Sequence, residues 1–349
     1  MSNFDDYKLA VEAMSGGKNT VLLDDMGMPS VMVIIPKMKN SEILNGGSDI
    51  VHPAFIVNNT EKDFVYVSKF QNIVMKDRGY SLPMKNPAVS MDFDTALAYC
   101  RNKGNGWCLT PISVWSAIAL WCRKNSSMPN GNNNYGRDVT NTWEKGVPVG
   151  DLDSGKVAHT ATGSGPASWY HDGTPAGIAD MNGNIWEWNA GMRLNNGEIN
   201  IIENSNVFDN TISLADDSAA WKAMNASGSL IAPGASGSLK YDWVSSKIQL
   251  TTSITTQADS GRSCEYKVMS LASGLSAPEL AKALLVYPDE PNGDYGGDKH
   301  YMNNTGERLP ICGGGWNAGA AAGVFSVGLY NPRSNSRWSI GFRAAFCDL

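Results

Sequence analysis

The side chains able to do chemistry are few, and they stand far apart along the chain. The six cysteines are Cys100, Cys108, Cys122, Cys264, Cys312 and Cys347, and the four histidines are His52, His159, His171 and His300. No two cysteines have the C-x-x-C spacing of a zinc ribbon or a thioredoxin-type motif, and no two histidines have H-x-x-x-H spacing. We therefore expect free, buried thiols and no redox or zinc site.

Other catalytic and metal-binding patterns are incomplete. The chain has no G-x-S-x-G in a strand–turn–helix context, so a serine hydrolase is not indicated. His171 stands next to Asp172 and could be a ligand, but a hydrogen-bonded histidine in a turn is the simpler interpretation. Residues 151–155 imitate the start of a calcium loop without the glutamate that completes it. We expect no catalytic residues and no metal ligands. We also expect no cofactor, although a structural calcium ion is compatible with the sequence.

The last segment, residues 313–343, mixes apolar anchors with residues of no common chemistry. Residues 326–330 alternate with period two, as a half-buried strand does. On that strand we expect Val327 and Leu329 to point inward, and Ser326, Gly328 and Tyr330 to point outward. The other expected anchors are Trp316, Val324, Phe325, Ile340 and Phe342.

The blocks of this segment follow a recognisable order. Gly-Gly-x-Trp-Asn-x-Gly-Ala-x-Ala-Gly-Val-Phe occupies 313–325, Arg-Ser-Asn-Ser occupies 333–336, and Ile-Gly-Phe-Arg occupies 340–343. Upstream stand Asp-Met-Asn-Gly-Asn-Ile-Trp-Glu-Trp at 180–188, Pro-Asn-Gly-Asn-Asn-Asn-Tyr-Gly at 129–136, and His-Pro-Ala-Phe at 52–55 with Tyr-Val-Ser-Lys-Phe at 66–70. Together they resemble the variable proteins of diversity-generating retroelements, which have a C-type lectin fold of the formylglycine-generating-enzyme type.

The resemblance implies a binding function. In that family, the positions between the blocks are diversified by adenine-directed reverse transcription and face a ligand. The family includes phage receptor-binding tail proteins, so the implied partner is a protein or glycan receptor on a bacterial cell surface. A virion tail is the implied location, where a homo-oligomer is compatible with the family. The implied ligand-binding residues are Gly315, Asn317, Ala318, Ala321, Ser326, Gly328, Tyr330, Arg337, Trp338 and Ser339.

Two functions of related folds fit less well. Formylglycine-generating enzymes use a C-terminal cysteine pair, whereas the segment between Trp316 and Gly341 contains no cysteine. Calcium-dependent lectins use Glu-Pro-Asn and Trp-Asn-Asp motifs. The chain has the first at 290–292, but Ala318 replaces the aspartate of the second, so a ligand oxygen is lost. An inactive enzyme relative and a lectin-like module of fixed specificity remain the alternatives.

Composition restricts the partners. The formal net charge is −6, without a basic run, so nucleic acid is not an expected partner. No apolar run approaches the ~18 residues of a membrane helix, and no signal peptide is visible. We expect a protein that is not inserted in a membrane, located in a virion or in the cytoplasm before release.

The expected elements come in the order helix, strands, two helices, a long loop-rich region and late strands. We expect helices from Asp5 to Met14, near 93–100 with Asp92 or Ser90 as cap, from 112 to 123 with Thr110 as cap, over 214–224, and from Ser276 to Leu285. Residues 20–23, 31–36 and 64–70 are expected strands, and 40–49 a loop. The final Phe-Arg-Ala-Ala-Phe is expected to pair with early strands.

These elements predict an α+β fold: two helices around a small mixed or antiparallel sheet, with long irregular loops and insertions. We expect an N-terminal segment over 1–50 and a lectin-like domain over 51–349. Within that domain we expect an insertion over about 190–300 and a variable region over about 313–343.

Overall fold

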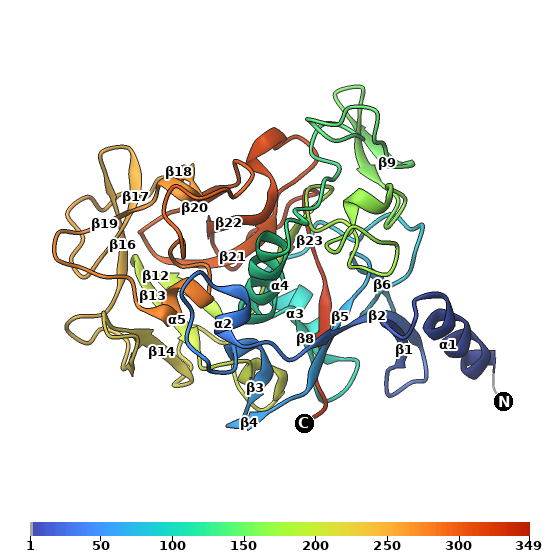
Figure 1. Ribbon diagram of the computed structural model, residues 1–349, viewed down its shortest axis with the longest axis horizontal. Helices are drawn as coiled ribbons and strands as arrows, with labels where there is room; N and C mark the ends of the chain where they lie inside the picture. The colour runs from blue at the N-terminus through green and yellow to red at the C-terminus, as the bar shows by residue number, and fades with distance from the viewer. Residues whose placement is uncertain (1–2) are drawn as a thin grey trace.

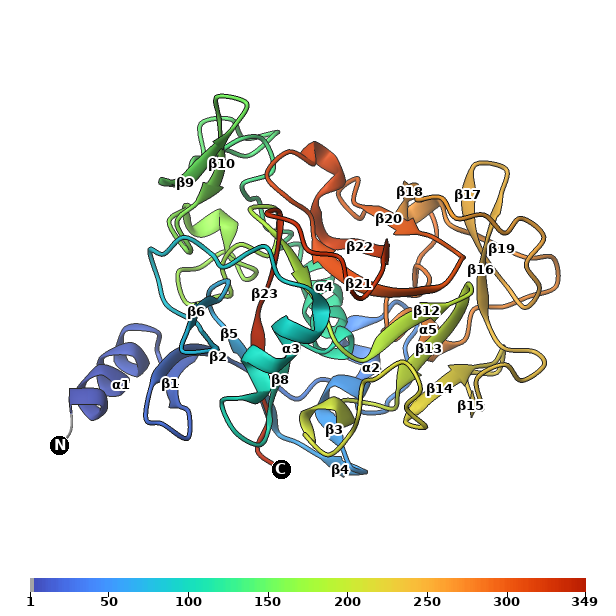
Figure 2. The same ribbon diagram turned by 180° about the vertical axis from the view of Figure 1, so that it is seen from behind.

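The computed structural model describes residues 3–349, which form a mixed α and β protein with many strands and few helices (Figures 1 and 2). Among the described residues, no helix combines the length and the apolar character needed to cross a membrane. The α-helices are α1 (Asn3–Met14), α2 (Asn40–Ile43), α3 (Phe93–Arg101), α4 (Ile112–Lys124) and α5 (Glu279–Ala283). Single turns of 3₁₀ helix are η1 (Pro53–Phe55), η2 (Ala167–Trp169), η3 (Asn206–Phe208), η4 (Tyr266–Val268) and η5 (Gly319–Ala321).

The two ends of the chain meet in a five-stranded sheet of order β1-β2-β5-β24-β8. Ala345 in the last strand lies opposite Val67 on one side and Cys108 on the other. The predicted pairing of the final segment with early strands is therefore confirmed, and Figure 1 shows the red C-terminal strand beside the blue β5. The strands are β1 (Asn19–Leu23), β2 (Pro29–Pro36), β5 (Phe64–Ser68), β24 (Ala344–Phe346) and β8 (Trp107–Leu109).

A larger sheet carries the rest of the C-terminal segment, in the order β18-β20-β22-β21-β12-β13-β16-β17-β19. Strand β11 joins it by pairing with β21 and β23, and β14 joins by pairing with β13 and β15. The strands are β11 (Trp186–Trp188), β12 (Met192–Asn195), β13 (Glu198–Ile202), β14 (Trp221–Met224), β15 (Leu230–Ile231), β16 (Lys240–Val244), β17 (Lys247–Thr251), β18 (Arg262–Glu265), β19 (Ser270–Leu271), β20 (Lys299–Met302), β21 (Glu307–Gly313), β22 (Gly323–Asn331) and β23 (Ile340–Phe342).

Three small hairpins lie outside these sheets. The β9–β10 hairpin forms part of the lobe at the top of Figure 1. The three hairpins are formed by β3 (Ile56–Val57) with β4 (Thr60–Glu61), by β6 (Ile73–Met75) with β7 (Arg78–Tyr80), and by β9 (Pro148–Asp153) with β10 (Lys156–Thr160).

The two central helices form where the sequence predicts them, but only one has the predicted cap. The Asp92 carboxylate accepts a hydrogen bond from Thr95 N–H at 2.9 Å and caps α3. Helix α4 begins at Ile112, as expected, but its cap residue is Pro111, which makes no side-chain hydrogen bond. Thr110 is not the cap because its N–H and hydroxyl both donate to the Arg343 carbonyl.

Three other local predictions are wrong. Residues 214–224 are not helical: Trp221 and Ala223 instead pair with β13, where tertiary pairing outweighs the helix propensity of the alanines. The 276–285 helix shrinks to α5, and Glu279 at its start accepts hydrogen bonds from Ser48 and Asn40. The expected 40–49 loop begins with α2.

A buried ion pair holds the two sheets together. The Arg343 guanidinium donates from Nε and Nη2 to the two carboxylate oxygens of Glu187, at 2.9 and 2.8 Å. Its remaining N–H groups donate to the carbonyls of Ser68, Lys69 and Ala179. All five donors of a fully buried guanidinium are thus used, which is the condition under which a buried charge is tolerated.

Removing one partner of this pair leaves the other charge buried and unpaired. We expect Glu187→Gln to lower the free energy of unfolding by about 3 kcal/mol, measured by urea denaturation. The matched control is Glu12→Gln, because Glu12 pairs with Lys8 on the exposed helix α1 and its loss should change stability little. Equal effects of the two substitutions would contradict a structural role for the buried pair.

His52 provides a second, pH-dependent test of the core. It is fully buried, its Nδ1 accepts from Ala54 N–H at 3.1 Å, and its Nε2 lies 3.0 Å from the Ala283 carbonyl. Burial lowers the pKa of His52 to about 4. The folded state therefore resists protonation that the unfolded chain accepts near its ordinary pKa of about 6.5.

This histidine stabilises the fold fully above about pH 6.5, and the stability is lost as the pH falls toward 4. Between pH 7 and pH 5 we expect His52 alone to remove about 2 kcal/mol from the free energy of unfolding. The measurement compares urea denaturation of the wild-type chain and His52→Gln at both pH values. An unchanged pH dependence in the variant would show that His52 does not contribute.

Candidate functional site

The candidate site is the outer part of residues 313–343, and its apolar frame is as predicted. Trp316, Val324, Phe325, Val327, Leu329, Ile340 and Phe342 are all buried. Two polar groups fix the start of β22: the Trp115 indole N–H donates to the Val324 carbonyl at 2.8 Å, and the Asp298 carboxyl accepts from Phe325 N–H at 2.8 Å. The frame is therefore held by both packing and directional contacts.

The loop before β22, residues 314–322, folds back on itself. Gly314 has φ of +86°, and a Cβ there would lie 2.4 Å from that of Ala322, so only glycine fits this turn. The loop is tied to its neighbours by Gly319 N–H donating to the Asn133 carbonyl and by Tyr135 N–H donating to the Trp316 carbonyl. The Trp316 indole donates to Asp153 at 3.1 Å.

The loop after β22, residues 332–339, is anchored at both ends. Arg333 pairs with Glu307 at 2.9 Å and with Asp94 at 2.7 Å. The Arg337 carbonyl accepts from the N–H groups of Ser90 and Ile340, which leaves its side chain free to project. Position 337 and its neighbour Trp338 thus stand on a fixed backbone.

The ten residues predicted to bind ligand divide by exposure. Asn317, Arg337 and Trp338 are exposed, with Trp338 40% exposed. Ala318, Ala321, Tyr330 and Ser339 are half-buried, and Gly315, Ser326 and Gly328 are buried. The three buried positions contradict the expectation of outward-facing side chains.

At position 328, the face of β22 is covered by aromatic rings, which accounts for the burial of Gly328. A Cβ at position 328 would lie 2.7 Å from Cε1 of Tyr330, so the Tyr330 ring lies over Gly328. Tyr301 is the parallel-strand partner of Gly328, and its ring centroid lies 5.5 Å from that of Tyr330. Both faces of the strand are buried from 323 to 329, so the predicted exposed outer face is wrong at positions 326 and 328.

Gly315 is buried for another reason. A Cβ at this position would lie 3.4 Å from the Trp186 ring, which is ordinary contact without overlap. Position 315 therefore has room for a Cβ next to Trp186 and near the exposed Asn317.

Two aromatic groups line the candidate site. In the first, Trp186 meets Tyr301 edge-on at 5.8 Å, and Tyr301 packs on Tyr330. In the second, the Trp316 and Trp338 rings lie 4.5 Å apart, with His159 at 4.9 and 5.7 Å from them. The Trp186 N–H donates to the Ser339 carbonyl, which links the two groups through the backbone.

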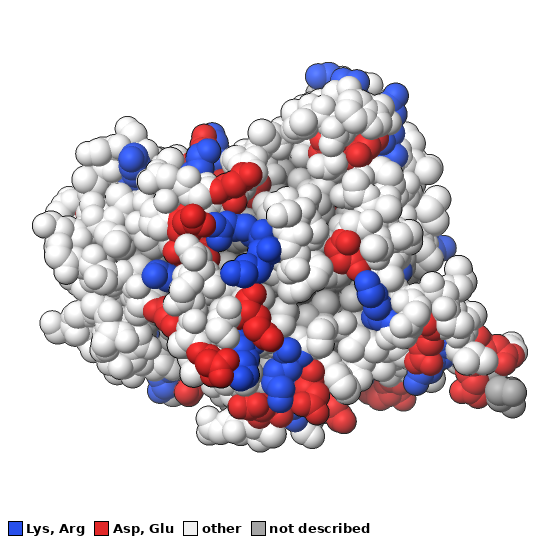
Figure 3. Space-filling model, viewed as in Figure 1, with Lys and Arg blue, Asp and Glu red and all other residues white. Residues whose placement is uncertain are grey.

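Charges at the site are few. Burial raises the pKa of the Tyr330 hydroxyl, and the nearby positive charge of Arg337 opposes this shift. Burial also lowers the pKa of His159, although its Nε2 lies 3.2 Å from the Trp338 carbonyl. The exposed Arg337 thus places a positive charge beside the aromatic rings, and the Asp153 carboxylate lies against the Trp316 indole. On the face seen in Figure 3, basic and acidic side chains are interspersed and large areas carry neither.

The sequence analysis missed two residues that pack beneath this surface, Tyr301 and His159. Trp186 is buried in the core, and its ring meets Tyr301 of a distant strand edge-on. The 299–302 strand lies in a region with weak periodicity, so nothing local indicated Tyr301. No sequence pattern pointed to His159 either, because only the fold brings it against Trp316 and Trp338.

The alternative chemical sites gain no support from the geometry. All six cysteines are buried, free thiols, as expected, and burial raises the pKa of Cys312 well above its ordinary value. Within residues 3–349, no group of three or more His, Cys, Asp or Glu side chains is arranged to hold a metal ion. In the Glu-Pro-Asn tripeptide, Glu290 forms an ion pair with Arg123.

Comparison with known proteins shows similarity to one family over part of the chain. Residues 45–210 match the FGE-sulfatase family. This family is described as the sulfatase-modifying factor enzyme 1-like domain, and the match covers just under half of the chain. It confirms the predicted resemblance to the formylglycine-generating-enzyme type over those residues. The FGE-sulfatase segment contains α3, α4 and the Asn-Gly-Asn turn, and ends before the C-terminal segment.

Solved structures give looser similarities. The chain is similar to variable protein 1 of Treponema denticola, with 10% identity, a TM-score of 0.35, and coverage of 94% of this chain and 98% of the other. It is also similar to the Major Tropism Determinant P3c variant, with 9% identity and a TM-score of 0.31, and to the M1 variant, with 10% and 0.32. Both comparisons cover 94% of this chain and 71% of the determinant. A search of curated proteins finds no match.

The buried Ser326 gives a direct test of this geometry. Its hydroxyl has no hydrogen-bond partner among the described residues. Because an unpaired buried hydroxyl is unfavourable, we expect Ser326→Ala to raise the free energy of unfolding by about 1 kcal/mol. Urea denaturation measures the change, and Ser336→Ala on the exposed loop is the control, with an expected change near zero. A clear loss of stability in Ser326→Ala would contradict the unpaired state of this hydroxyl.

Proposed function

We propose that the chain is a receptor-binding protein whose C-terminal segment presents a diversified surface to a target on a bacterial cell. The observation that carries this proposal is the exposed Trp338 beside Arg337, on a loop whose backbone is fixed at both ends. Trp, Tyr and Arg are the residue types that most often dominate binding energy at protein interfaces. A fixed backbone reduces the entropy lost on binding.

The distribution of buried and exposed positions supports diversification. Large buried side chains occupy the predicted frame, whereas exposed or half-buried side chains occupy seven of the ten predicted variable positions. A Cβ at position 315 would make ordinary contact with Trp186. The surface can therefore change its chemistry while the packing beneath it stays the same.

The remaining parts of the proposal rest on the resemblance described from the sequence. We assign the fold to the C-type lectin class of the formylglycine-generating-enzyme type, with an N-terminal segment over 1–50 and a main domain over 51–349. We place the protein in a phage tail, as a non-enzymatic adhesin, with a protein or glycan receptor. A reverse-transcriptase gene and a near-copy of the 3′ coding segment beside this gene would support the diversification part.

The binding surface can be tested with a matched tryptophan control. The labelled chain is titrated onto a panel of whole bacterial cells, and a strain that binds it saturably is used for the variants. We expect Arg337→Ala with Trp338→Ala to weaken binding at least about a hundredfold, because the two residues would lie centrally in the interface. The melting temperature should stay within a few degrees.

Trp143→Ala is the control, since Trp143 is 74% exposed and lies outside the candidate surface. This variant should bind as the wild-type chain does. If Trp143→Ala abolished binding and the double variant kept it, the binding surface would be the β9–β10 lobe, and the proposal would be wrong.

A further inference from the structure

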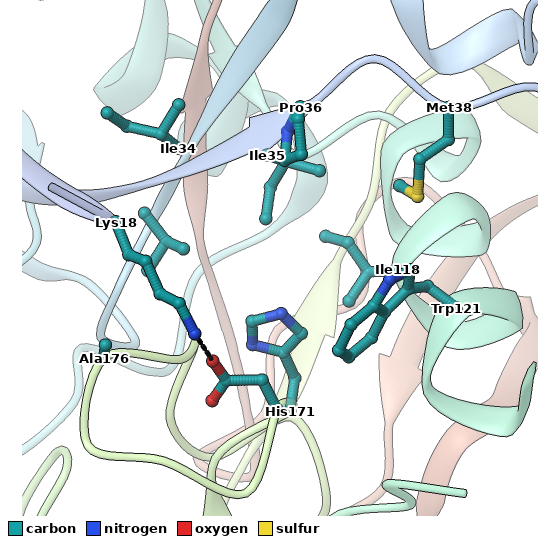
Figure 4. Close-up of a pocket in the computed structure, with 11 residues that line it drawn as sticks. Lys18, Ile34, Ile35, Pro36, Met38, Ile118, Trp121, His171 and Ala176 are labelled. Carbon is teal, nitrogen blue, oxygen red and sulfur yellow. Dashed lines mark hydrogen bonds and ion pairs between the residues drawn. The ribbon is translucent and has the colours of Figure 1, made fainter. Parts of the chain in front are cut away.

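A second site lies away from the C-terminal segment, between the first strands and helix α4. It is a cavity of about 250 Å³, lined by β2, by α4, by the 171–176 turn and by Lys18 (Figure 4). Its walls are mainly apolar, and Val33, Ile35, Met38, Ile118 and Trp121 provide most of them. A cavity of this size is smaller than a typical drug-sized pocket and suits a small molecule.

One polar group projects into this cavity from its base. The His171 Nδ1 accepts a hydrogen bond from Ile178 N–H at 2.7 Å, which assigns the ring proton of the neutral imidazole to Nε2. That nitrogen faces the space between Ile35 and Ile118 in Figure 4, and it has no hydrogen-bond partner within residues 3–349. His171 is buried, with an exposed fraction of 7%, and its ring offers an unused donor to the cavity.

The imidazole is held rigidly in this orientation. The His171 N–H donates to the Ile178 carbonyl at 2.9 Å. The His171 carbonyl accepts from the Ser127 hydroxyl at 2.7 Å and from the Cys122 thiol at 3.3 Å. Trp121 packs against the ring with centroids 5.5 Å apart. A donor fixed by this many contacts is ready for a ligand without rearrangement.

The mouth of the cavity carries one cation and one anion, which form an ion pair. Burial keeps His171 neutral by lowering its pKa to about 4, so the ring donates without carrying charge at neutral pH. The Lys18 ammonium lies at the mouth, 58% exposed and 3.2 Å from the Asp172 carboxylate. Asp172 is already engaged by Lys18 and by the N–H and hydroxyl of Thr174. Lys18 therefore keeps further donors available for an incoming oxygen.

We propose that this cavity binds a small apolar monocarboxylate. Its hydrocarbon part would lie against Val33, Ile35, Met38 and Ile118, and its carboxylate would accept from His171 Nε2–H, near Lys18 Nζ. Helix α4 separates this site from the C-terminal segment. Trp115 in the helix contacts β22 through the Val324 carbonyl, whereas Trp121 lines the cavity. The proposal is therefore independent of the receptor-binding surface.

The test uses the full chain and three probes of one shape: 4-methylpentanoate, its amide, and 3-methylbutylamine. Isothermal titration calorimetry should show saturable binding of 4-methylpentanoate at one site per chain. The amide should bind about tenfold more weakly, because it loses the charged acceptor. The amine should bind more weakly than the acid, because it lacks an acceptor for His171 Nε2–H.

Three variants then locate the site. In His171→Asn, the Asn Oδ1 can still accept from Ile178 N–H while the donor at Nε2 is removed, so binding should weaken about tenfold. Lys18→Met should weaken binding about threefold, because its charge is largely exposed, and Lys8→Met on α1 is its matched control with no expected effect. Ala176→Phe should abolish binding by filling the mouth.

Four results would overturn the proposal. These are no saturable heat with 4-methylpentanoate in the folded wild-type chain, equal affinities for acid and amide, tighter binding of the amine, or unchanged affinity in both Ala176→Phe and Lys18→Met. The last two variants change side chains at the rim, so they keep the test decisive even if His171→Asn does not fold.

Discussion

The buried pair between Glu187 and Arg343 is the contact on which the rest of the structure depends. Arg343 stands between β23 and β24, and Glu187 lies in β11. The Arg343 guanidinium therefore joins two sheets. One is the five-stranded sheet in which the two ends of the chain pair, and the other is the larger sheet that carries the C-terminal segment. Because an ion pair in the interior stabilises only when every donor is used, the five contacts of Arg343 also fix the relative positions of β5, β11 and the 179 turn.

This anchor lies beneath the two loops of the candidate site and holds the strands from which they start. Strand β11 lies between β21 and β23, with Glu187 opposite both Cys312 and Gly341. The two loops of the candidate site begin and end on these strands or on β22. Their ends are thus fixed by strand pairing, while Asn317, Arg337 and Trp338 project from the loops between.

The sequence predicted the frame better than the surface, for a physical reason. Burial of Phe325 or Leu329 follows from local alternation, and the cap at Asp92 follows from its own side chain. The aromatic cover near Gly328 includes Tyr301 of β20, which no local pattern reveals. The helix predicted over residues 214–224 is absent for the same reason, since pairing with β13 outweighed helix propensity there. The cavity at His171 also requires β2 and α4 to be brought together in space.

The Tyr330 ring over Gly328 has a consequence for any diversified repertoire. A side chain larger than hydrogen at 328 would occupy the space that the ring now fills, so the two positions cannot be sampled independently. Changes there are epistatic: a bulky residue at 328 requires a small one at 330 or a rotated ring. The number of usable combinations is therefore smaller than the product of the choices at each position, and sequence pairs at 328 and 330 should carry a signature of mutual exclusion.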